Sequence, residues 1–272
     1  MKYAASRIVI FSTVLLLTVA LGLGCVKSSK SNAPKETPPP DTVIVSKNGA
    51  GQYTTIGEAL KGVQPGMQIL VRSGVYNESL IIDKQVEIVA DQRGPGEQVV
   101  LQSFKSSSIT MRTDRAVVRG FIIRHRLGMM GALYKLLFRS GGPAVEIARG
   151  ELVLEDCDIT SDSVAGIAIH GLTAKPVIRR TRIHDGQSNG VWVYGGGQGT
   201  LEDCDIWGNE WAGVLIEGGG DPVVRRCKVH HHRNAGVVVA DGGLGTFEDC
   251  EIWSNTYHGV EDDPAHYGRV PR

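Results

Sequence analysis

Imidazole and indole side chains recur at one position of a motif that repeats in the second half of the chain. Three successive copies read LEDCDIWGN, VRRCKVHHH and FEDCEIWSN, 23 residues apart. Flat rings repeated at this spacing offer apolar faces that suit the CH faces of sugars, unless the rings pack over one another and brace the turn. The predicted ligand-binding residues are the rings at this position and two rings across the next turn: His184, Trp207, His230, Trp253, Trp211 and Tyr257.

Acid–base chemistry has one candidate group, near the end of the chain. Glu261, Asp262 and Asp263 lie close in sequence to His258 and His266, and no basic column of the repeat faces them. Carboxylates beside an imidazole can serve as general acid and base. We therefore keep His258, Glu261, Asp262 and Asp263 as candidate catalytic residues, although they fall at the frayed end of the repeat.

Metal binding has one candidate, the run His230-His231-His232. Imidazoles bind zinc or copper, but consecutive residues of a strand point to opposite faces. His184 belongs to the same column as His230 and lies two repeats away, roughly 9.6 Å at the usual strand spacing. A solvated turn is the favoured interpretation, and we predict neither a metal nor a cofactor.

The repeat itself predicts the architecture that positions these residues. The column Cys157, Thr181, Cys204, Cys227 and Cys250 recurs every 23 or 24 residues, and a Gly follows nine residues after each. Each unit holds short runs in which apolar and polar residues alternate, which is the pattern of β-strands. A coil of about 23 residues with three strands predicts an all-β, single-stranded parallel β-helix, right-handed by the general rule for parallel crossovers.

Charge also follows the repeat. The residues around the Cys column are acidic, then basic, then acidic again in successive units, from Glu155-Asp156 through Arg179-Arg180 to Glu202-Asp203 and onward. Opposite charges on neighbouring strands contribute about 0.2 to 1 kcal/mol per pair. We interpret these charges as registering the coils rather than as catalytic groups.

The cysteines of the repeat form one inward column. Stacked thiols with parallel Cβ directions are poorly aimed for a disulfide, and a linear column cannot surround a zinc ion tetrahedrally. We expect Cys157, Cys204, Cys227 and Cys250 to be reduced and buried, as small apolar residues.

The first 41 residues predict export and tethering. Lys2 and Arg7 precede an apolar run that ends at Cys25, and residues 26–41 are rich in Ser, Pro and Lys. The segment Leu21–Cys25 resembles a bacterial lipoprotein signal, which implies lipidation of Cys25 and anchoring to the bacterial membrane, on its periplasmic side or at the cell surface. Plain secretion or an uncleaved anchor are the alternatives.

The predicted domain organisation follows from these segments. Residues 1–25 form the signal, 26–41 a disordered linker, 42–263 the β-helix and 264–272 a C-terminal tail. A short helix over Thr55–Gly62, with Thr54 or Thr55 as N-cap, is expected to cover the open end of the solenoid. About fourteen extra residues interrupt the repeat within 127–142 and are expected to pack on the protein as a loop.

Two sequence patterns resemble known families. The pattern Gly-x-Tyr-x-Thr-x-x-Glu-Ala at Gly51–Ala59 and Gly-x-Tyr-x-Glu at Gly74–Glu78 resemble the opening of pectinesterases. The repeats after Gly120 resemble those of the pectate-lyase-like superfamily, which includes carbohydrate-binding and sugar-hydrolase β-helix modules. The resemblance covers about residues 43–260 and implies a right-handed β-helix; it is specific for the fold rather than for an activity.

The catalytic pattern of pectinesterases is not matched in this chain. Where that family has Gln before Ala-Val, this sequence has Pro143, and Ser161-Asp162-Ser163 stands at the Gln-Asp pair. Gln187-Ser188-Asn189-Gly190 replaces the Asp-Phe segment. We infer that the two carboxylates needed as nucleophile and general acid are missing, so esterase activity is not expected.

These observations favour a tethered recognition module that binds polysaccharide or cell-envelope glycan through an outward aromatic face, without catalysis. The alternatives are a polysaccharide lyase, hydrolase or esterase of the pectin-active type, and a scaffold that binds protein or self-associates through its C-terminal coil. A net charge of zero argues against electrostatic capture of nucleic acid. Contact with a membrane is expected through the lipid anchor only.

Overall fold

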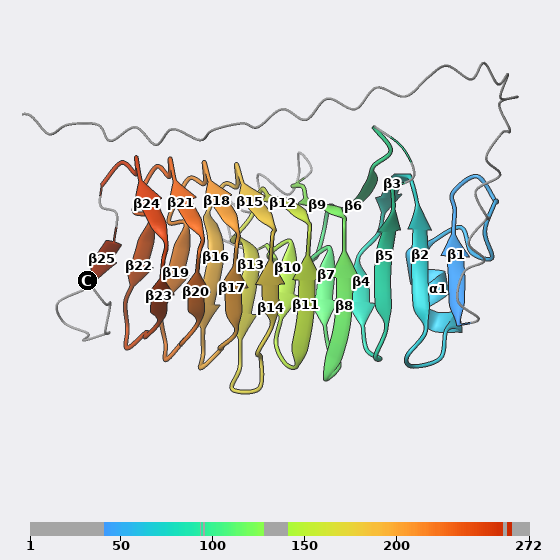
Figure 1. Ribbon diagram of the computed structural model, residues 1–272, viewed down its shortest axis with the longest axis horizontal. Helices are drawn as coiled ribbons and strands as arrows, with labels where there is room; N and C mark the ends of the chain where they lie inside the picture. Colours follow the sequence, from blue (N-terminus) through green and yellow to red (C-terminus); the bar gives the residue numbers. More distant parts are fainter. Residues whose placement is uncertain (1–40, 93, 95, 128–140, 258–259, 263–272) are drawn as a thin grey trace, which may run out of the picture. The chain divides into compact units, whose positions relative to one another are not determined.

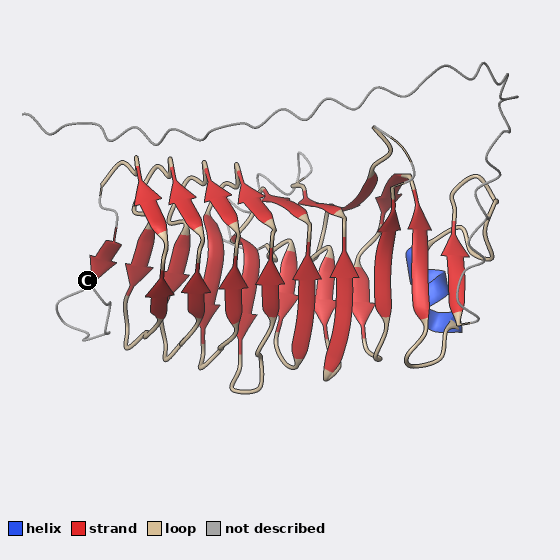
Figure 2. Ribbon diagram, viewed as in Figure 1, coloured by secondary structure: helices blue, strands red, loops and turns tan. Residues whose placement is uncertain are grey.

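The computed structural model describes residues 41–92, 94, 96–127, 141–257 and 260–262. Within them, three parallel sheets run side by side and every coil adds one strand to each (Figures 1 and 2). This arrangement is the predicted parallel β-helix. No helix in the described ranges is long and apolar enough to cross a membrane.

The sheets are named A, B and C in the order in which each coil visits them. Sheet A contains β1 (Thr42–Val45), β2 (Gln68–Arg72), β5 (Glu87–Asp91), β8 (Arg115–Arg119), β11 (Glu151–Glu155), β14 (Val177–Arg179), β17 (Thr200–Glu202), β20 (Val223–Arg225) and β23 (Thr246–Glu248). Sheet B contains β3 (Gly74–Asn77), β6 (Val99–Ser103), β9 (Ile122–His125), β12 (Asp158–Ser161), β15 (Arg182–His184), β18 (Asp205–Trp207), β21 (Lys228–His230) and β24 (Glu251–Trp253). Sheet C contains β4 (Leu80–Ile82), β7 (Ile109–Met111), β10 (Val145–Ile147), β13 (Ala165–His170), β16 (Asn189–Tyr194), β19 (Val214–Ile216), β22 (Val237–Val239) and β25 (Val260–Asp262).

The core is built from inward columns of identical or similar side chains. In sheet B, Ile159 pairs with Ile183, which pairs with Ile206, which pairs with Val229. All four are 0% exposed. Because alternate residues of a strand face opposite sides, the central residue of each triplet faces the core and its two neighbours face outward.

A left-handed residue turns the chain from sheet A to sheet B in every coil of the regular repeat. It lies directly before the Cys column, and the φ angles are between 47° and 53°. This residue breaks the strand alternation, so the inward-facing Leu201 and Cys204 are three positions apart. These non-glycine residues are Asp156, Arg180, Asp203, Arg226 and Asp249.

The alternating charges form ion pairs between coils, as predicted. Glu155 is the most buried of them, with a side chain 6% exposed that contacts Arg119 at 2.9 Å, Arg179 at 2.9 Å and Arg180. In a later coil, Arg226 contacts Asp203 at 2.8 Å and also Glu202. The charges therefore fix the register of one coil on the next.

The helix predicted for the N-terminal end is α1 (Ile56–Gly62), with Thr55 as its N-cap. Ile56, Ala59 and Leu60 are buried, and the helix contacts β1, β2 and β4. Glu78 accepts hydrogen bonds from the N–H groups of Ile56 at 3.0 Å and Gly57 at 2.8 Å. Glu78, the last residue of the Gly74–Glu78 pattern, thus caps the helix that begins within the Gly51–Ala59 pattern.

Candidate functional site

The rings predicted to bind sugar on sheet B form a continuous stack. His184 lies on Trp207 with ring centroids 4.2 Å apart and planes 1° apart, and His230 lies on Trp253 at 4.3 Å. Trp207 and His230 are 6.2 Å apart. The two imidazoles stack on the faces of Trp207, which is the alternative in which the rings pack over one another. Whether the stack binds a ligand remains a prediction.

Carboxylates of the preceding coil, and one of the same coil, hold the imidazoles of this stack. His184 Nε2 lies 3.0 Å from Asp158, and its Nδ1 lies 2.9 Å from Asp185. Partial burial alone would lower the pKa of His184, but the hydrogen bonds to these two carboxylates outweigh it and raise that pKa. His230 Nε2 lies 2.9 Å from Asp205. The stack therefore carries an anchored imidazole on alternate coils.

Trp211 and Tyr257 lie outside the stack, on the segment that leads from sheet B to sheet C. Their side chains are 55% and 69% exposed, and Trp253 at the end of the stack is 37% exposed. Asn234 occupies the coil between Trp211 and Tyr257, as shown by the backbone bond from Tyr257 N–H to the Asn234 carbonyl. These three rings are the part of the predicted set that remains open to solvent.

The histidine run His230-His231-His232 is not a solvated turn, because His232 is 1% exposed. Its Nε2–H donates to the Ile206 carbonyl at 3.1 Å, and its Nδ1 accepts from Asn209 N–H at 3.2 Å. Burial, followed by His230 and His231, lowers the pKa of His232 to about 4. Of the three histidines, only His231 is exposed.

Asparagine occupies the same position one coil before and one coil after His232. Asn209 Nδ2 donates to the Ile183 carbonyl at 3.4 Å, and Asn255 Nδ2 donates to the Val229 carbonyl at 3.4 Å. The Asn255 side-chain oxygen Oδ1 accepts from His232 N–H at 3.0 Å. Asn209, His232 and Asn255 thus form one column in which the neutral imidazole of His232 donates and accepts the same hydrogen bonds as the asparagine side chains.

The cysteines are free thiols, in the column expected from the repeat. Three are buried, and burial raises the pKa of Cys157 to about 12. Cys250, in the last coil of the column, is half-buried. Among the described residues no group of three or more His, Cys, Asp or Glu side chains is arranged to hold a metal ion.

Several predicted site residues cannot be placed. Glu261 and Asp262 belong to β25, of which only the backbone is described. His258, Asp263, His266 and Cys25 lie outside the described residues, as does most of the 127–142 insertion.

A hollow in the described surface lies over sheet C and was not predicted. It consists of two adjoining pockets, of about 610 and 420 Å³, that share Ser79, Leu80, Ile81 and Arg112. We call it the basic trough because four cations line it: Lys61 from α1, Lys84 after β4, Lys105 after β6 and Arg112 after β7. Asp83 and Glu146 are the acids of its lining.

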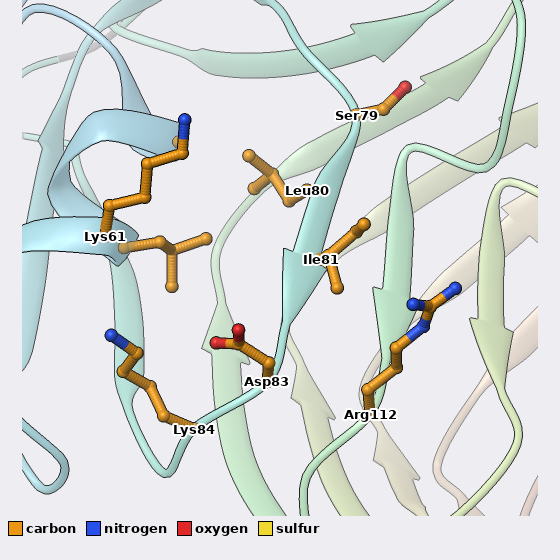
Figure 3. A pocket seen from close by; sticks show the side chains of 9 residues that line it. Lys61, Ser79, Leu80, Ile81, Asp83, Lys84 and Arg112 are labelled. Carbon is orange, nitrogen blue, oxygen red and sulfur yellow. The ribbon is translucent and has the colours of Figure 1, made fainter.

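Figure 3 shows that the trough is formed by parts far apart in sequence. The Lys61 side chain extends from the helix, Asp83 and Lys84 follow the strand that carries Leu80 and Ile81, and Arg112 follows the neighbouring strand, β7. These cations were not predicted from the sequence because the first coils are irregular in length and do not align with the 23-residue repeat.

The outer face of sheet C continues from the trough into a cluster of titratable side chains. Glu146 lines the trough, and its Oε1 lies 3.5 Å from His170 Nε2. The His170 ring stacks on Tyr194 at 4.9 Å, and Tyr194 stacks on Trp192 at 4.1 Å. Burial, then Glu146 and Glu217, raises the pKa of Tyr194. We call Glu146, His170 and Tyr194 the sheet C cluster.

The segments aligned with the pectinesterase catalytic pattern lie near this face. Asp162 is a carboxylate at the position aligned with the Gln-Asp pair, where none was expected, and it lies 3.9 Å from Arg126 and accepts from Leu127 N–H at 3.4 Å. Asn189 is buried, and its side-chain oxygen accepts from Ala212 N–H at 3.3 Å. One aligned segment therefore holds an acid, and the other holds an amide that supports the next coil.

Sequence comparisons connect the chain with β-helix proteins and pectinesterases. A family model described as "right handed beta helix region" matches residues 133–262. Probable pectinesterase/pectinesterase inhibitor 17 of Arabidopsis thaliana is 24% identical over 169 residues, which cover 53% of this chain and 33% of that protein. Putative pectinesterase/pectinesterase inhibitor 45 of the same plant is 33% identical over 92 residues, 32% of this chain and 14% of that protein. The chain thus spans a third or less of the length of these relatives.

Solved structures share the fold at low sequence identity. A pectin methylesterase from Aspergillus niger matches with a TM-score of 0.61 and 14% identity, over 86% of this chain and 84% of that one. Pectin methylesterase PemA from Erwinia chrysanthemi matches with 0.56 and 15%, over 79% of both chains. Pectate lyase Pel9A matches with 0.52 and 11%, over 84% of this chain and 74% of that one. The fold is a right-handed parallel β-helix of the pectate-lyase-like type.

Proposed function

We propose that this β-helix binds an acidic polysaccharide of the pectin type in the basic trough. The observation that carries the proposal is the set of four cations around one open hollow, on two neighbouring coils and the capping helix. A pectic chain presents a carboxylate at every free galacturonate, so cations repeated at coil spacing complement it. The pectinesterase relatives support the same class of ligand.

Binding of polygalacturonate to the full-length chain in detergent tests this proposal, with neutral dextran as the comparison. Isothermal titration is expected to show binding of polygalacturonate alone, weakening as salt screens the exposed cations. Lys61→Ala combined with Arg112→Ala is expected to weaken binding about tenfold or more, which is about 1.4 kcal/mol. Lys175→Ala removes an exposed lysine from a turn outside the trough and is the matched control. Equal affinity for dextran, or an unaffected double variant, contradicts the proposal.

A second carbohydrate surface is supported by the exposure of Trp211, Trp253 and Tyr257. Sugars that stack on these rings change tryptophan fluorescence, and Trp211→Ala with Trp253→Ala is expected to abolish that change. Trp207→Ala is a separate test of the covered part of the stack. If neither the trough nor the rings bind any polysaccharide, the scaffold interpretation is favoured.

Tethering by lipidated Cys25 remains part of the proposal and is supported by the signal-like sequence alone. Metabolic labelling with a radioactive fatty acid is expected to label the chain and to fail in Cys25→Ser. Label that persists in this variant contradicts the assignment.

A further inference from the structure

The last coil of the solenoid has an open edge in the described structure, where sheet A ends at β23. The core side chains of this coil are half-buried, whereas their equivalents one coil earlier are buried. These pairs are Phe247 over Val224, Cys250 over Cys227 and Ile252 over Val229. Because an uncovered strand edge pairs readily with other chains, a solenoid of this kind needs a segment that covers its last coil.

The same edge is acidic. In both earlier acidic coils of the repeat, the acid before the Cys column meets an arginine of the next coil: Arg180 contacts Asp156 at 2.9 Å, and Arg226 contacts Asp203 at 2.8 Å. Asp249 is the equivalent acid of the last coil, and it is exposed, with no ion-pair partner among the residues that the structure describes. A covering segment with an arginine at this position would complete the pattern.

The backbone hydrogen bonds of sheet A also point beyond the last coil. The N–H of Asp203 donates to the Arg225 carbonyl at 3.2 Å, and the N–H of Arg226 donates to the Glu248 carbonyl at 2.8 Å, each one coil onward. Asp249 has the same left-handed conformation, with a φ of 52° against 51° for Arg226. Its N–H is therefore aimed at a carbonyl one coil further along the solenoid.

The sequence that follows β25 keeps the spacing of the repeat, although it lies outside the described residues. In the two preceding coils, residues 217–222 and 240–245 connect the sheet C strand to the next sheet A strand. These connections are equal in length. Asp262 ends β25 and pairs with Val239, the residue directly before the second connection. A connection of the same length after Asp262 makes Arg269 the first residue of a further sheet A strand.

This register puts suitable side chains over the open edge. Val270 falls over Phe247 in the inward column, and Arg272 falls over Asp249. Pro271 lies between them; it cannot donate a ladder hydrogen bond, but its carbonyl can accept from the Asp249 N–H. With Arg272 included, the sign of the charge alternates along the whole column. That column reads Asp156, Arg180, Asp203, Arg226, Asp249 and Arg272.

We propose that residues 269–272 add a further strand to sheet A and close the C-terminal end of the solenoid. Val270 covers Phe247, and Arg272 pairs with Asp249. The equal length of the connections favours these residues of the same chain over those of a second copy. The added strand takes up the backbone donors that would otherwise pair with another molecule. This inference does not depend on the proposed function.

Hydrogen exchange of the full-length chain in detergent, read by mass spectrometry at single-residue resolution, tests the proposal at the Asp249 N–H. We expect this amide to exchange at least about tenfold more slowly than an unstructured amide, because it is bonded to the added strand. Exchange at the unstructured rate overturns the proposal. Protection that appears only when the protein concentration is raised also overturns it, because a second copy then covers the edge.

Two charge reversals in the same segment test the register. Arg272→Glu sets an acid over Asp249 and is expected to raise the exchange rate of the Asp249 amide by about fivefold or more. Arg269→Glu is the matched control, because it makes the same charge change over the uncharged Thr246, and it should alter that rate by less than about twofold. The Arg226 amide, bonded within the described coils, should keep its rate in both variants. Equal rates at Asp249 in wild type and Arg272→Glu, or equal effects of the two variants, overturn the proposed register.

Discussion

Replacement of His232 by Asn is expected to remove a specific sensitivity of the fold to acid. The buried imidazole is held neutral by a donor and an acceptor bond, and Asn supplies both in the coils on either side. At pH 7.5 the variant is therefore expected to unfold with a free energy within about 1 kcal/mol of wild type. The two proteins are expected to diverge as the pH falls.

The sign and size of that divergence follow from the pKa of His232. Its pKa is about 4 in the folded protein against 6.5 in a free imidazole, so between these values the unfolded chain binds more protons. Stability from the neutral imidazole is complete above pH 6.5 and is lost as the pH falls toward 4. The full loss is about 3 kcal/mol, of which about 2.5 kcal/mol is lost by pH 4.5.

Urea unfolding at pH 7.5 and pH 4.5, followed by circular dichroism, measures this effect. Wild type is expected to lose about 2.5 kcal/mol more than His232→Asn between the two values, since all other titrating groups are common to both. His231→Asn is the matched control, because it removes the exposed neighbour and should retain the wild-type decline. Parallel declines in wild type and His232→Asn would refute the reasoning.

Three further changes test the fold and the stack. Glu155→Gln is expected to lower the free energy of unfolding by about 1 to 3 kcal/mol, because a carboxylate that is only 6% exposed loses its charge among arginine partners. The control is Glu248→Gln, at a side chain 51% exposed, which should change the free energy of unfolding by less than about 0.5 kcal/mol in the same urea titration. Gly213→Ala should cost about 1 to 3 kcal/mol, since its Cβ would lie 2.5 Å from His232 Nε2 and from Val229 Cγ1, and Gly94→Ala, with nothing within 4 Å, should be neutral. Protonated His184 stabilises the fold, so its contribution is present below pH 6.5 and is lost as the pH rises through its raised pKa. Because His184 stacks on Trp207, this loss of the proton should change tryptophan fluorescence, and the change should be absent in His184→Gln.

The features that recur in every coil were predictable from sequence. The Cys column, the alternating charges and the ring column share a period, and stacking parallel coils converts that period directly into contacts. The helix start at Thr55 was predictable for a local reason, since its side chain accepts from Glu58 N–H at 3.2 Å.

The features that break the period were not predictable. Lys61, Lys84 and Arg112 meet only because coils of unequal length bring them to one hollow. His232 looked like part of a surface histidine run, because the left-handed residue at His231 that turns it inward leaves no mark in the hydrophobic pattern. Glu146, His170 and Tyr194 sit in different motifs, and only the strand register makes them neighbours.

Because the ion-pair charges alternate in sign, the charge pattern of this molecule repeats every two coils rather than every coil. Glu155 faces Arg179, Arg179 faces Glu202 and Glu202 faces Arg225, so neighbouring coils are complementary rather than equivalent. Removing one coil would set like charges against each other at the new junction, for example Glu155 against Glu202, while removing two adjacent coils would keep opposite charges in contact there. A gene encoding such a solenoid can therefore grow or shrink without penalty only by pairs of coils, and its internal duplications are expected in steps of about 46 residues, twice the 23-residue repeat.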